Sequence, residues 1–110
     1  MVNVSSIVGL TPMGSNMGHA VATAGLIYLT RCLAVAFAPD VTVNCVAPSL
    51  MEGTRGALLA PAAVVKAMRQ RTVLKRNPSV QAVVDQVVYF CRADTVTGQV
   101  LVIDGGVHFH

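Results

Sequence analysis

Three short apolar segments have the spacing of β-strands. Val2-Asn3-Val4 forms a short segment that ends at Ser5 and Ser6 and lacks an alternation deep enough to mark one exposed face, as is typical of a central strand in a parallel sheet. Residues 41–47 carry β-branched side chains at alternate positions, and residues 99–103 end at an Asp-Gly-Gly turn. We predict a strand at each of these segments.

The longest periodic segment, residues 19–38, has apolar residues at the three- and four-residue steps of a helix. Ser15 or Asn16 is a suitable cap for its start. Pro39 ends it, because proline lacks the N–H that continues a helix. Residues 9–18 before it are rich in Gly, Pro, Ser and Asn and are predicted to form a loop.

Two further helices are predicted between the second and third strands. One begins at Pro61, since proline suits the first turn of a helix, and the other begins at residues 78–79. Residues 49–59 precede them as a variable loop. The order strand, helix, strand, helices, strand predicts parallel strands joined by right-handed crossovers. We therefore expect one α/β domain, residues 1–110, with three parallel strands flanked by helices.

Composition predicts a folded domain that needs a partner surface. The chain has 110 residues, enough for one small domain. Hydrophobic residues make up 54% of it and charged residues 12%, a ratio that excludes disorder and fits a buried core. Because a free-standing domain of this size is usually less apolar, we expect another surface to cover part of this one.

The positive charge of the chain is unevenly distributed. The net charge is +3, yet residues 1–30 contain no charged side chain. Aromatic residues do not interleave with the basic cluster as base stacking requires, so we predict a solvated face and no nucleic-acid partner, with phosphate binding as the alternative. Five of the eight basic residues form this cluster: Lys66, Arg69, Arg71, Lys75 and Arg76.

The start of the chain predicts neither a signal peptide nor a membrane span. It lacks a basic beginning, and glycine, proline and asparagine interrupt the apolar residues. The odd number of cysteines, Cys32, Cys45 and Cys91, without metal-ligand spacing favours buried free thiols in a reducing compartment. We therefore expect a cytoplasmic protein without a membrane partner.

Two histidines alternate at the C-terminus of the chain. His108 and His110 lie on a short tail after the last predicted strand. With help from a third ligand they would bind a metal, but a disordered or packed tail is the favoured prediction. We therefore predict no metal site.

Four segments together resemble the short-chain dehydrogenase/reductase family. They are the Asn-Val-Ser-Ser of residues 3–6, the helix start at residues 19–25, the Val-Asn-Cys-Val-Ala-Pro of residues 43–48, and the segment from Thr97-Gly98-Gln99 to the final Asp-Gly-Gly. The residues around 38–41 and the final Asp-Gly-Gly resemble acyl-carrier or pteridine reductases of this family. The match covers nearly the whole chain in the family's order and spacing.

The resemblance implies the C-terminal half of a Rossmann-like, doubly wound parallel sheet. In this fold type a Gly-rich turn after the first strand holds the pyrophosphate of the dinucleotide, and the chain contains no such glycine pattern. The first strands are missing with it, and Met1 would lie inside a core strand. We therefore expect part of a longer protein that uses NAD or NADP, and we doubt that this chain alone binds the cofactor.

The resemblance assigns three candidate catalytic positions. Ser6 matches the family serine that polarises the substrate oxygen, 19 − 6 = 13 residues before the tyrosine position. His19 stands at the position of the proton-donating tyrosine, and Thr23 at that of the lysine. A histidine donates or accepts protons near neutral pH without an adjacent ammonium, whereas a threonine supplies no charge. Tyr28 lies half a helical turn out of phase and is expected in the core or an interface.

The loop after the second predicted strand is the candidate cofactor contact. In the family this loop touches the nicotinamide carboxamide, which here implicates Pro48, Ser49, Met51 and Thr54. The family usually has glycine at the position of Ser49, and its threonine stands one residue before Thr54. Backbone contacts survive both changes.

Three functions remain open. The resemblance implies an NAD(P)-dependent oxidoreductase that acts on a small carbonyl or alcohol substrate in its full-length form. The residues at positions 19 and 23 favour a non-catalytic oligomerising or scaffolding subunit instead. A third possibility is an isomerase or dehydratase in which Ser6 and His19 run proton transfer alone. In the family the helix at residues 19–38 packs against its counterpart in a partner subunit, so a homo-oligomer is expected.

Overall fold

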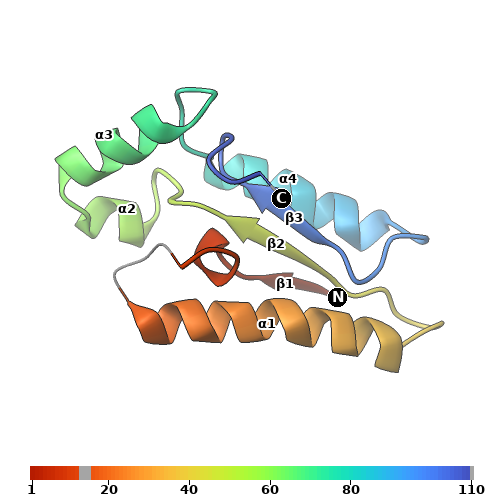
Figure 1. Ribbon diagram of the computed structural model, residues 1–110. Coiled ribbons are helices and arrows are strands. Elements are labelled where there is room, and N and C mark those ends of the chain that lie inside the picture. Colours follow the sequence, from red (N-terminus) through yellow and green to blue (C-terminus); the bar gives the residue numbers. More distant parts are fainter. Residues whose placement is uncertain (13–15, 110) are drawn as a thin grey trace.

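Three parallel strands form the centre of the molecule (Figure 1). The computed structural model describes residues 1–12 and 16–109. Strands β1 (Val2–Val4), β2 (Asn44–Pro48) and β3 (Val100–Ile103) pair in the order β1-β2-β3, with Asn3 opposite Cys45 and Val46 opposite Leu101. The α/β class with three parallel strands is therefore confirmed.

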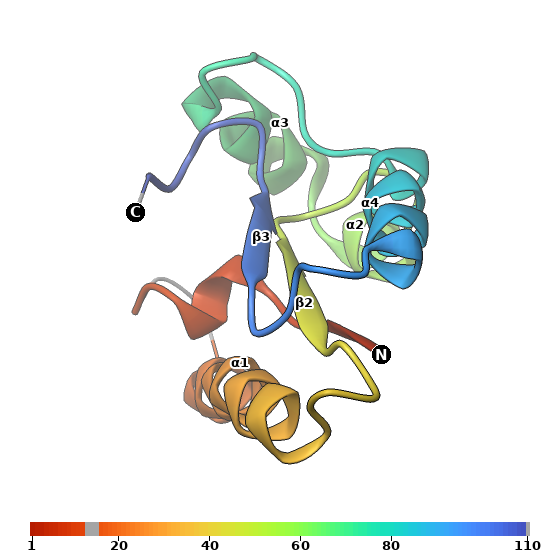
Figure 2. The same cartoon turned by 90° about the vertical axis from the view of Figure 1, so that its right-hand side faces the viewer.

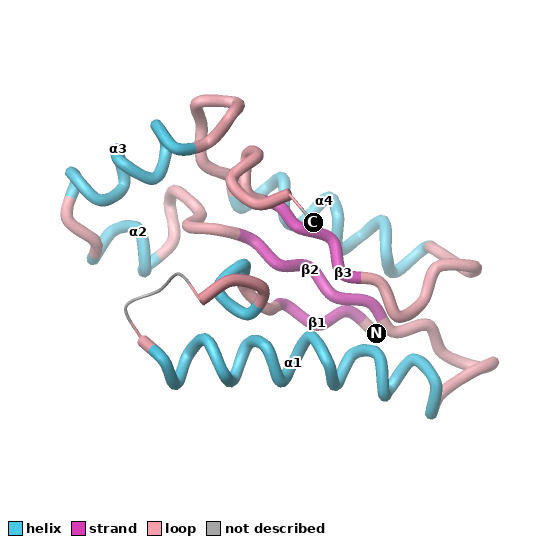
Figure 3. The backbone as a smooth tube through the Cα atoms, in the orientation of Figure 1, coloured by secondary structure: helices cyan, strands magenta, loops and turns pink. Residues whose placement is uncertain are grey.

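The two longest helices cover opposite faces of this sheet (Figure 2). Helix α1 (Met17–Ala36) follows β1, and helix α4 (Val80–Arg92) precedes β3. The 3₁₀ turn η1 (Ile7–Gly9) and the helices α2 (Arg55–Leu59) and α3 (Ala62–Arg71) lie toward the carboxyl ends of the strands (Figures 1 and 3). This arrangement places the loops after β1 and β2 at one end of the sheet.

The element boundaries differ from the sequence prediction in places that hydrogen bonds explain. The amide oxygen of Asn16 accepts from the backbone N–H of His19 at 3.1 Å, so α1 begins at Met17, two residues earlier than predicted. Ser15, the other candidate cap, lies outside the described residues. Val43 bonds to the turn before β3, donating to Thr97 Oγ1 and accepting from Gly98 N, so β2 begins only at Asn44.

One helix was not predicted at all. The hydroxyl of Thr54 accepts from the backbone N–H of Ala57 at 3.4 Å and begins α2 within the expected loop. This single capping contact starts a helix of only five residues, which a pattern of apolar spacing is too short to reveal.

The core is built around β2. Every residue of this strand is buried, and Val46 packs against Val83 and Phe90 of α4. Asn44, fully buried, donates from its amide to Val96 O at 2.7 Å and accepts from Gln99 N at 3.1 Å. These two bonds fasten β2 to the turn that leads into β3, because buried polar groups need partners.

Polar pairs join α1 to β1. Asn3 Nδ2 donates to Thr30 Oγ1 at 3.0 Å, and Ser5 Oγ donates to the carbonyl of Thr23 at 2.8 Å. The helix side facing the sheet therefore carries threonines among the apolar residues. A hydrophobic pattern alone would have assigned such positions to the outside.

The prediction of buried thiols is wrong for two of the three cysteines, and for Tyr28 one of two alternatives is excluded. Only Cys45 is buried, where burial raises the pKa of its thiol, whereas Cys32 and Cys91 are exposed. Tyr28 is 66% exposed and does not belong to the core. Tyr28 and Cys32 lie one turn apart on the side of α1 that nothing in the described chain covers, so the predicted interface role of Tyr28 stays a prediction.

Helix α1 has the length and apolar composition of a membrane-spanning helix. The glycine, proline and asparagine residues that led us to predict no membrane span lie before the helix or within its first turn, and they do not end it. Core helices of soluble proteins meet the same criterion, and α1 lies along the sheet with Ile27, Thr30 and Ala34 buried. The absence of a membrane partner stays a prediction.

The free edge of β1 leads us to expect self-association. Within the described chain β1 pairs only with β2, and the side chain of Val4 is 53% exposed. Unpaired edges of apolar strands add further strands, and a charged side chain there opposes this. The unmodified chain should therefore form oligomers in sedimentation velocity, and Val4→Lys should shift the distribution toward monomer. Val41→Lys, an exposed valine outside the strands, is the control; a monodisperse monomer of the unmodified chain contradicts the expectation.

Candidate functional site

The candidate site lies at the carboxyl ends of the strands. Open α/β sheets bind ligands at this end, where the loops after parallel strands come together. Here β1 leads into η1, and β2 leads into the loop before α2 (Figure 3). The first turn of α1 reaches the same end of the sheet (Figure 1).

A cavity of about 570 Å³ occupies this end. Its wall comes from Ser6 and η1, the start of α1, the loop after β2, the two residues that flank α2, helix α3, and Val107 after β3. Most of the lining is apolar. The polar side chains among its described lining residues are Ser6, Asn16, His19, Ser49, Thr54 and Arg71.

The structure brings together five of the seven predicted site residues. Ser6, His19, Ser49, Met51 and Thr54 line this one cavity although they come from three separate segments. Their catalytic and cofactor-binding roles remain predictions, but their shared location is what a common ligand requires.

The other two predicted site residues lie outside the cavity lining. Pro48 is the buried last residue of β2, and Thr23 is 9% exposed against β1. The hydroxyl of Thr23 lies 2.8 Å from the carbonyl oxygen of His19 and 3.1 Å from that of Ala20. A threonine inside a helix commonly bonds back in this way. Its hydrogen bond is therefore made within α1, in place of one to a ligand.

Ser6 and His19 are held by local capping contacts. Ser6 is the cap of η1, and its Oγ accepts from the backbone N–H of Val8 at 3.4 Å. His19 belongs to the first turn of α1, which Asn16 caps, and its side chain is exposed at the cavity. These contacts use the backbone of His19 only, so its imidazole remains available for proton transfer.

Ser49 carries a buried hydroxyl without a hydrogen-bond partner among the described residues. The residue is 8% exposed, and its backbone N–H donates to Ile103 O at 3.0 Å, which holds the loop to the end of β3. A buried hydroxyl left unpaired costs about 1–3 kcal/mol, so such groups usually meet a ligand or an ordered water. Ser49 is therefore the wall residue that most needs a polar partner.

The loop after β2 is fastened to α3 by an ion pair. Glu52 Oε1 accepts from Arg69 Nη2 at 2.6 Å and Nε at 3.0 Å, and from Asn77 Nδ2 at 3.1 Å. The hydrogen bond from Arg69 is the main reason that the pKa of Glu52 lies below its ordinary value. Thr54 Oγ1 also donates to Met51 O at 2.7 Å. The hydrogen bonds and the ion pair between Glu52 and Arg69 thus hold the loop side of the cavity against α3.

The residues that α3 contributes to the cavity were not among the predicted site residues, although the resemblance implies that residues 49–76 shape the pocket. Val64, Met68 and Arg71 line it from this helix. Arg71 belongs to the basic cluster, which we interpreted as a solvated face. Arg71 is the only charged side chain among the described lining residues.

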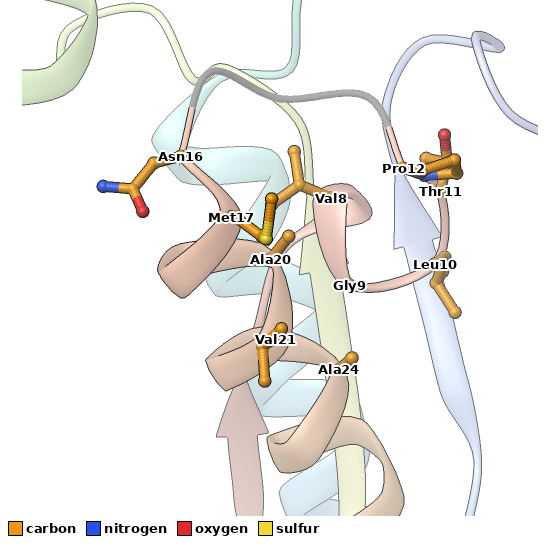
Figure 4. Close-up of a pocket in the computed structure, with 10 residues that line it drawn as sticks. All are labelled: Val8, Gly9, Leu10, Thr11, Pro12, Asn16, Met17, Ala20, Val21 and Ala24. Carbon is orange, nitrogen blue, oxygen red and sulfur yellow. The ribbon is translucent and has the colours of Figure 1, made fainter.

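A second hollow of about 610 Å³ lies between η1 and α1 (Figure 4). The side chains drawn there come from the turn after β1 and the first two turns of α1, and none of them is ionisable. At Gly9 the turn η1 approaches the backbone of α1 closely. A Cβ added to Gly9 would lie 2.7 Å from Ala24 N and from Thr23 C. Because none of its described lining side chains is ionisable, this hollow offers no candidate for acid–base catalysis.

Hydrogen bonds hold the start of the C-terminal tail, whereas Phe109 near its end is exposed. The carboxylate of Asp104 accepts from the backbone N–H groups of Gly106 at 2.8 Å and His108 at 2.7 Å. His110 lies outside the described residues. Within residues 1–12 and 16–109, no three side chains of His, Cys, Asp or Glu gather in a group that would hold a metal.

Comparison with known proteins finds relatives of this chain among reductases and dehydrogenases. A family model described as enoyl-(acyl carrier protein) reductase matches residues 1–108. A protein assigned as ketoacyl reductase 2 of the granaticin polyketide synthase of Streptomyces violaceoruber is 42% identical over 111 residues, covering 98% of this chain and 44% of that protein. The short-chain dehydrogenase/reductase homolog YusR of Bacillus subtilis is 32% identical over 106 residues, covering 96% of this chain and 81% of YusR.

A solved structure shares the fold. A short-chain dehydrogenase from Leptospira borgpetersenii with bound NAD⁺ superimposes with a TM-score of 0.84 at 27% sequence identity. The match covers 96% of this chain and 43% of the solved one. The chain thus spans less than half the length of this structure and of the granaticin relative.

Proposed function

Because the chain belongs to the short-chain dehydrogenase/reductase family, we propose that it is the substrate-side half of an NAD(P)-dependent oxidoreductase that interconverts a carbonyl and an alcohol. One observation carries the proposal: Ser6 and His19 line the same cavity at the carboxyl ends of the strands, beside the loop after β2. The granaticin relative bears a reductase name, and the Leptospira structure holds NAD⁺.

The residues of this chain fit the nicotinamide end of the cofactor. The buried hydroxyl of Ser49, which has no partner among the described residues, would donate a hydrogen bond to the carboxamide, and Met51 and Thr54 line the cavity beside it. The sequence contains no G-x-G-x-x-G turn to hold the pyrophosphate at a helix start. The rest of the dinucleotide therefore needs polypeptide outside these 110 residues.

Each catalytic group has a distinct task in the proposed reaction. The bound cofactor supplies or accepts the hydride. Ser6 donates a hydrogen bond to the substrate oxygen, and His19 passes the proton that the oxygen gains or loses. Thr23, whose hydroxyl is bound within α1, takes no part in proton transfer. In this proposal the single side chain of His19 takes over the proton transfer that a tyrosine and lysine pair performs in the family.

The cofactor test uses the chain with and without a complementary half. NAD(P)H fluorescence titration of the 110-residue chain alone should show no micromolar binding, because the pyrophosphate lacks its glycine-lined helix start. Co-expression with the part of the granaticin relative that precedes its aligned region should restore binding and reduction of a ketone. Micromolar affinity of the chain alone contradicts the proposed division of the cofactor site.

A second function, a non-catalytic oligomerising subunit, is favoured by Thr23. Thr23 stands at the position of the family lysine that faces the ligand. Its side chain is 9% exposed and donates its hydrogen bond to a carbonyl of its own helix. The same experiment separates the two functions. An assembled complex that binds NAD(P)H without any turnover supports the subunit, and turnover supports the oxidoreductase.

A further inference from the structure

We propose that Glu52 is a positioning residue for the substrate, one that holds α3 against the cavity without touching the ligand. The proposal rests on the proposed function in taking the ligand of this cavity to be the carbonyl or alcohol substrate. Met51 and Thr54 on either side of Glu52 line the cavity, but Glu52 is not among the lining residues. Its effect on a ligand must therefore pass through the elements that it contacts.

The helices α2 and α3 lack the apolar packing that holds the longer helices in place. They lie beyond the carboxyl end of β2 (Figure 1). Neither helix buries a residue within the described chain, and Leu58 and Leu59 at the end of α2 are 78% and 74% exposed. Because the packing of an apolar face normally fixes a helix in a protein, polar contacts must set the position of α3.

Glu52 supplies contacts to α3 and to the segment that follows it. Its backbone N–H donates to Pro78 O at 3.3 Å. Its Oε1 accepts from Arg69 Nη2 at 2.6 Å and from Asn77 Nδ2 at 3.1 Å. The same amide nitrogen of Asn77 donates to Val65 O at 3.3 Å. Glu52 thus holds α3 directly at residue 69 and, through Asn77, at residue 65, one turn earlier.

The two turns that Glu52 holds carry the apolar wall of the cavity. Val64 and Met68 line the cavity, and each directly precedes one of the two residues of α3 that these contacts reach. Residues four apart lie on the same face of a helix. Ser6 and His19 lie outside α2 and α3, on the segment before η1 and on α1. A shift of α3 would therefore change the space for the body of the substrate and leave the reacting groups in place.

Glu52→Gln tests this role, because it removes the charge and keeps the size of the side chain. The measurement uses the protein complemented as in the cofactor test, with cyclohexanone as the probe substrate. We expect KM to rise about fivefold, the upper end of what an exposed ion pair contributes. The value of kcat should stay within about twofold, since Val64 and Met68 contact the substrate and the transition state alike. A variant that had only lost part of its folded population would instead show a lower kcat.

Two further variants locate the effect. Asp85→Asn is the matched control, because Asp85 is also an exposed carboxylate and accepts from Gln81 Nε2 at 2.7 Å, but it lies on α4. It should leave KM unchanged. Arg69→Gln removes the ion pair from the side of α3 and should raise KM by a factor similar to that of Glu52→Gln. The double variant should raise KM no further than either single one, because one interaction is lost only once.

Hydrogen exchange of the 110-residue chain, followed by mass spectrometry, tests the contact without cofactor or turnover. In Glu52→Gln the backbone amides of α3 should exchange about fivefold faster, because fewer contacts oppose the local opening of this helix. The amides of α4 should exchange at the rate of the unmodified chain. Asp85→Asn should leave the exchange of α3 unchanged.

Three results overturn the proposal. An unchanged KM in Glu52→Gln is one, and effects of the two single variants that multiply in the double variant are another. The third is unchanged exchange of the α3 amides. If the unmodified complemented protein reduces no ketone, the proposed oxidoreductase function fails instead, and the exchange of α3 alone then decides the role of Glu52. The two proposals therefore fail distinguishably.

Discussion

Replacing His19 with glutamine is expected to lower the turnover of the assembled oxidoreductase at least about 100-fold, the usual contribution of a positioned acid or base. Glutamine keeps a hydrogen-bonding side chain at the first turn of α1 but does not exchange protons near neutral pH. The backbone contact with Asn16 survives, so the fold and the cavity remain. NAD(P)H affinity should stay within about twofold, because His19 acts on the substrate oxygen.

The measurement needs the complemented protein, a ketone substrate and a matched control. His108→Gln removes a second histidine, one that lies outside the cavity lining, and should leave turnover unchanged. Turnover by His19→Gln equal to that of the unmodified protein would assign proton transfer to another group. A fall in cofactor affinity of the same size as the fall in rate would instead assign His19 a binding role.

The second large effect comes from a single methyl group at Gly9. An added Cβ would lie 2.7 Å from Ala24 N and Thr23 C, which are backbone atoms of α1 and have no rotamer to change. Gly9→Ala must therefore push η1 away from α1. We expect the free energy of unfolding to fall by about 3 kcal/mol, the upper end of the usual cost of overpacking. For a domain of this size the melting temperature should fall by roughly 13 °C.

Gly25→Ala is the matched control for this substitution. It adds the same methyl group to α1 at an exposed position where nothing lies within 4 Å of the new Cβ. Alanine is the better helix former, so stability should rise by up to about 0.8 kcal/mol. Thermal unfolding by circular dichroism compares the two. A melting temperature for Gly9→Ala equal to that of the unmodified chain would mean that η1 and α1 do not approach as closely as described.

The effect of Gly9 on the site is a consequence of this packing. η1 follows directly after Ser6, and α1 carries His19 in its first turn. The close approach at Gly9 therefore helps to set how far apart Ser6 and His19 stand. A side chain at position 9 changes this separation without touching the cavity residues. We therefore expect Gly9→Ala to lower the proposed turnover of the assembled protein as well as its stability.

Local patterns were sufficient for most of the fold. The Asn16 cap, the Val-Asn-Val of residues 2–4 and the β-branched residues before Pro48 predicted α1, β1 and β2. Parallel pairing followed from the long helical connections between strands. The start of β2 was misplaced, because Val43 pairs with Thr97 and Gly98, which lie more than fifty residues away in the chain.

The candidate site was only partly predictable. Ser6, His19 and Ser49 were identified from their places in motifs, and the cavity contains all three. Arg71 was missed because its position in a basic cluster resembles a solvated helix face. Thr23 was placed beside His19 by helical spacing, but the direction of its hydroxyl depends on the carbonyl groups of its own helix.

Order along the chain was thus decided by local chemistry: caps, proline breaks and the periods of helix and strand need only neighbouring residues. The tertiary structure decided which side chains face the core or the cavity and which residues lie close together. Which cysteines are covered, which hydroxyl is left without a partner at Ser49, and which charge lines the cavity depend on elements far apart in sequence. The physical reason is that burial and hydrogen bonding are properties of the packed surface, and the packed surface exists only once β1, β2 and their helices have come together.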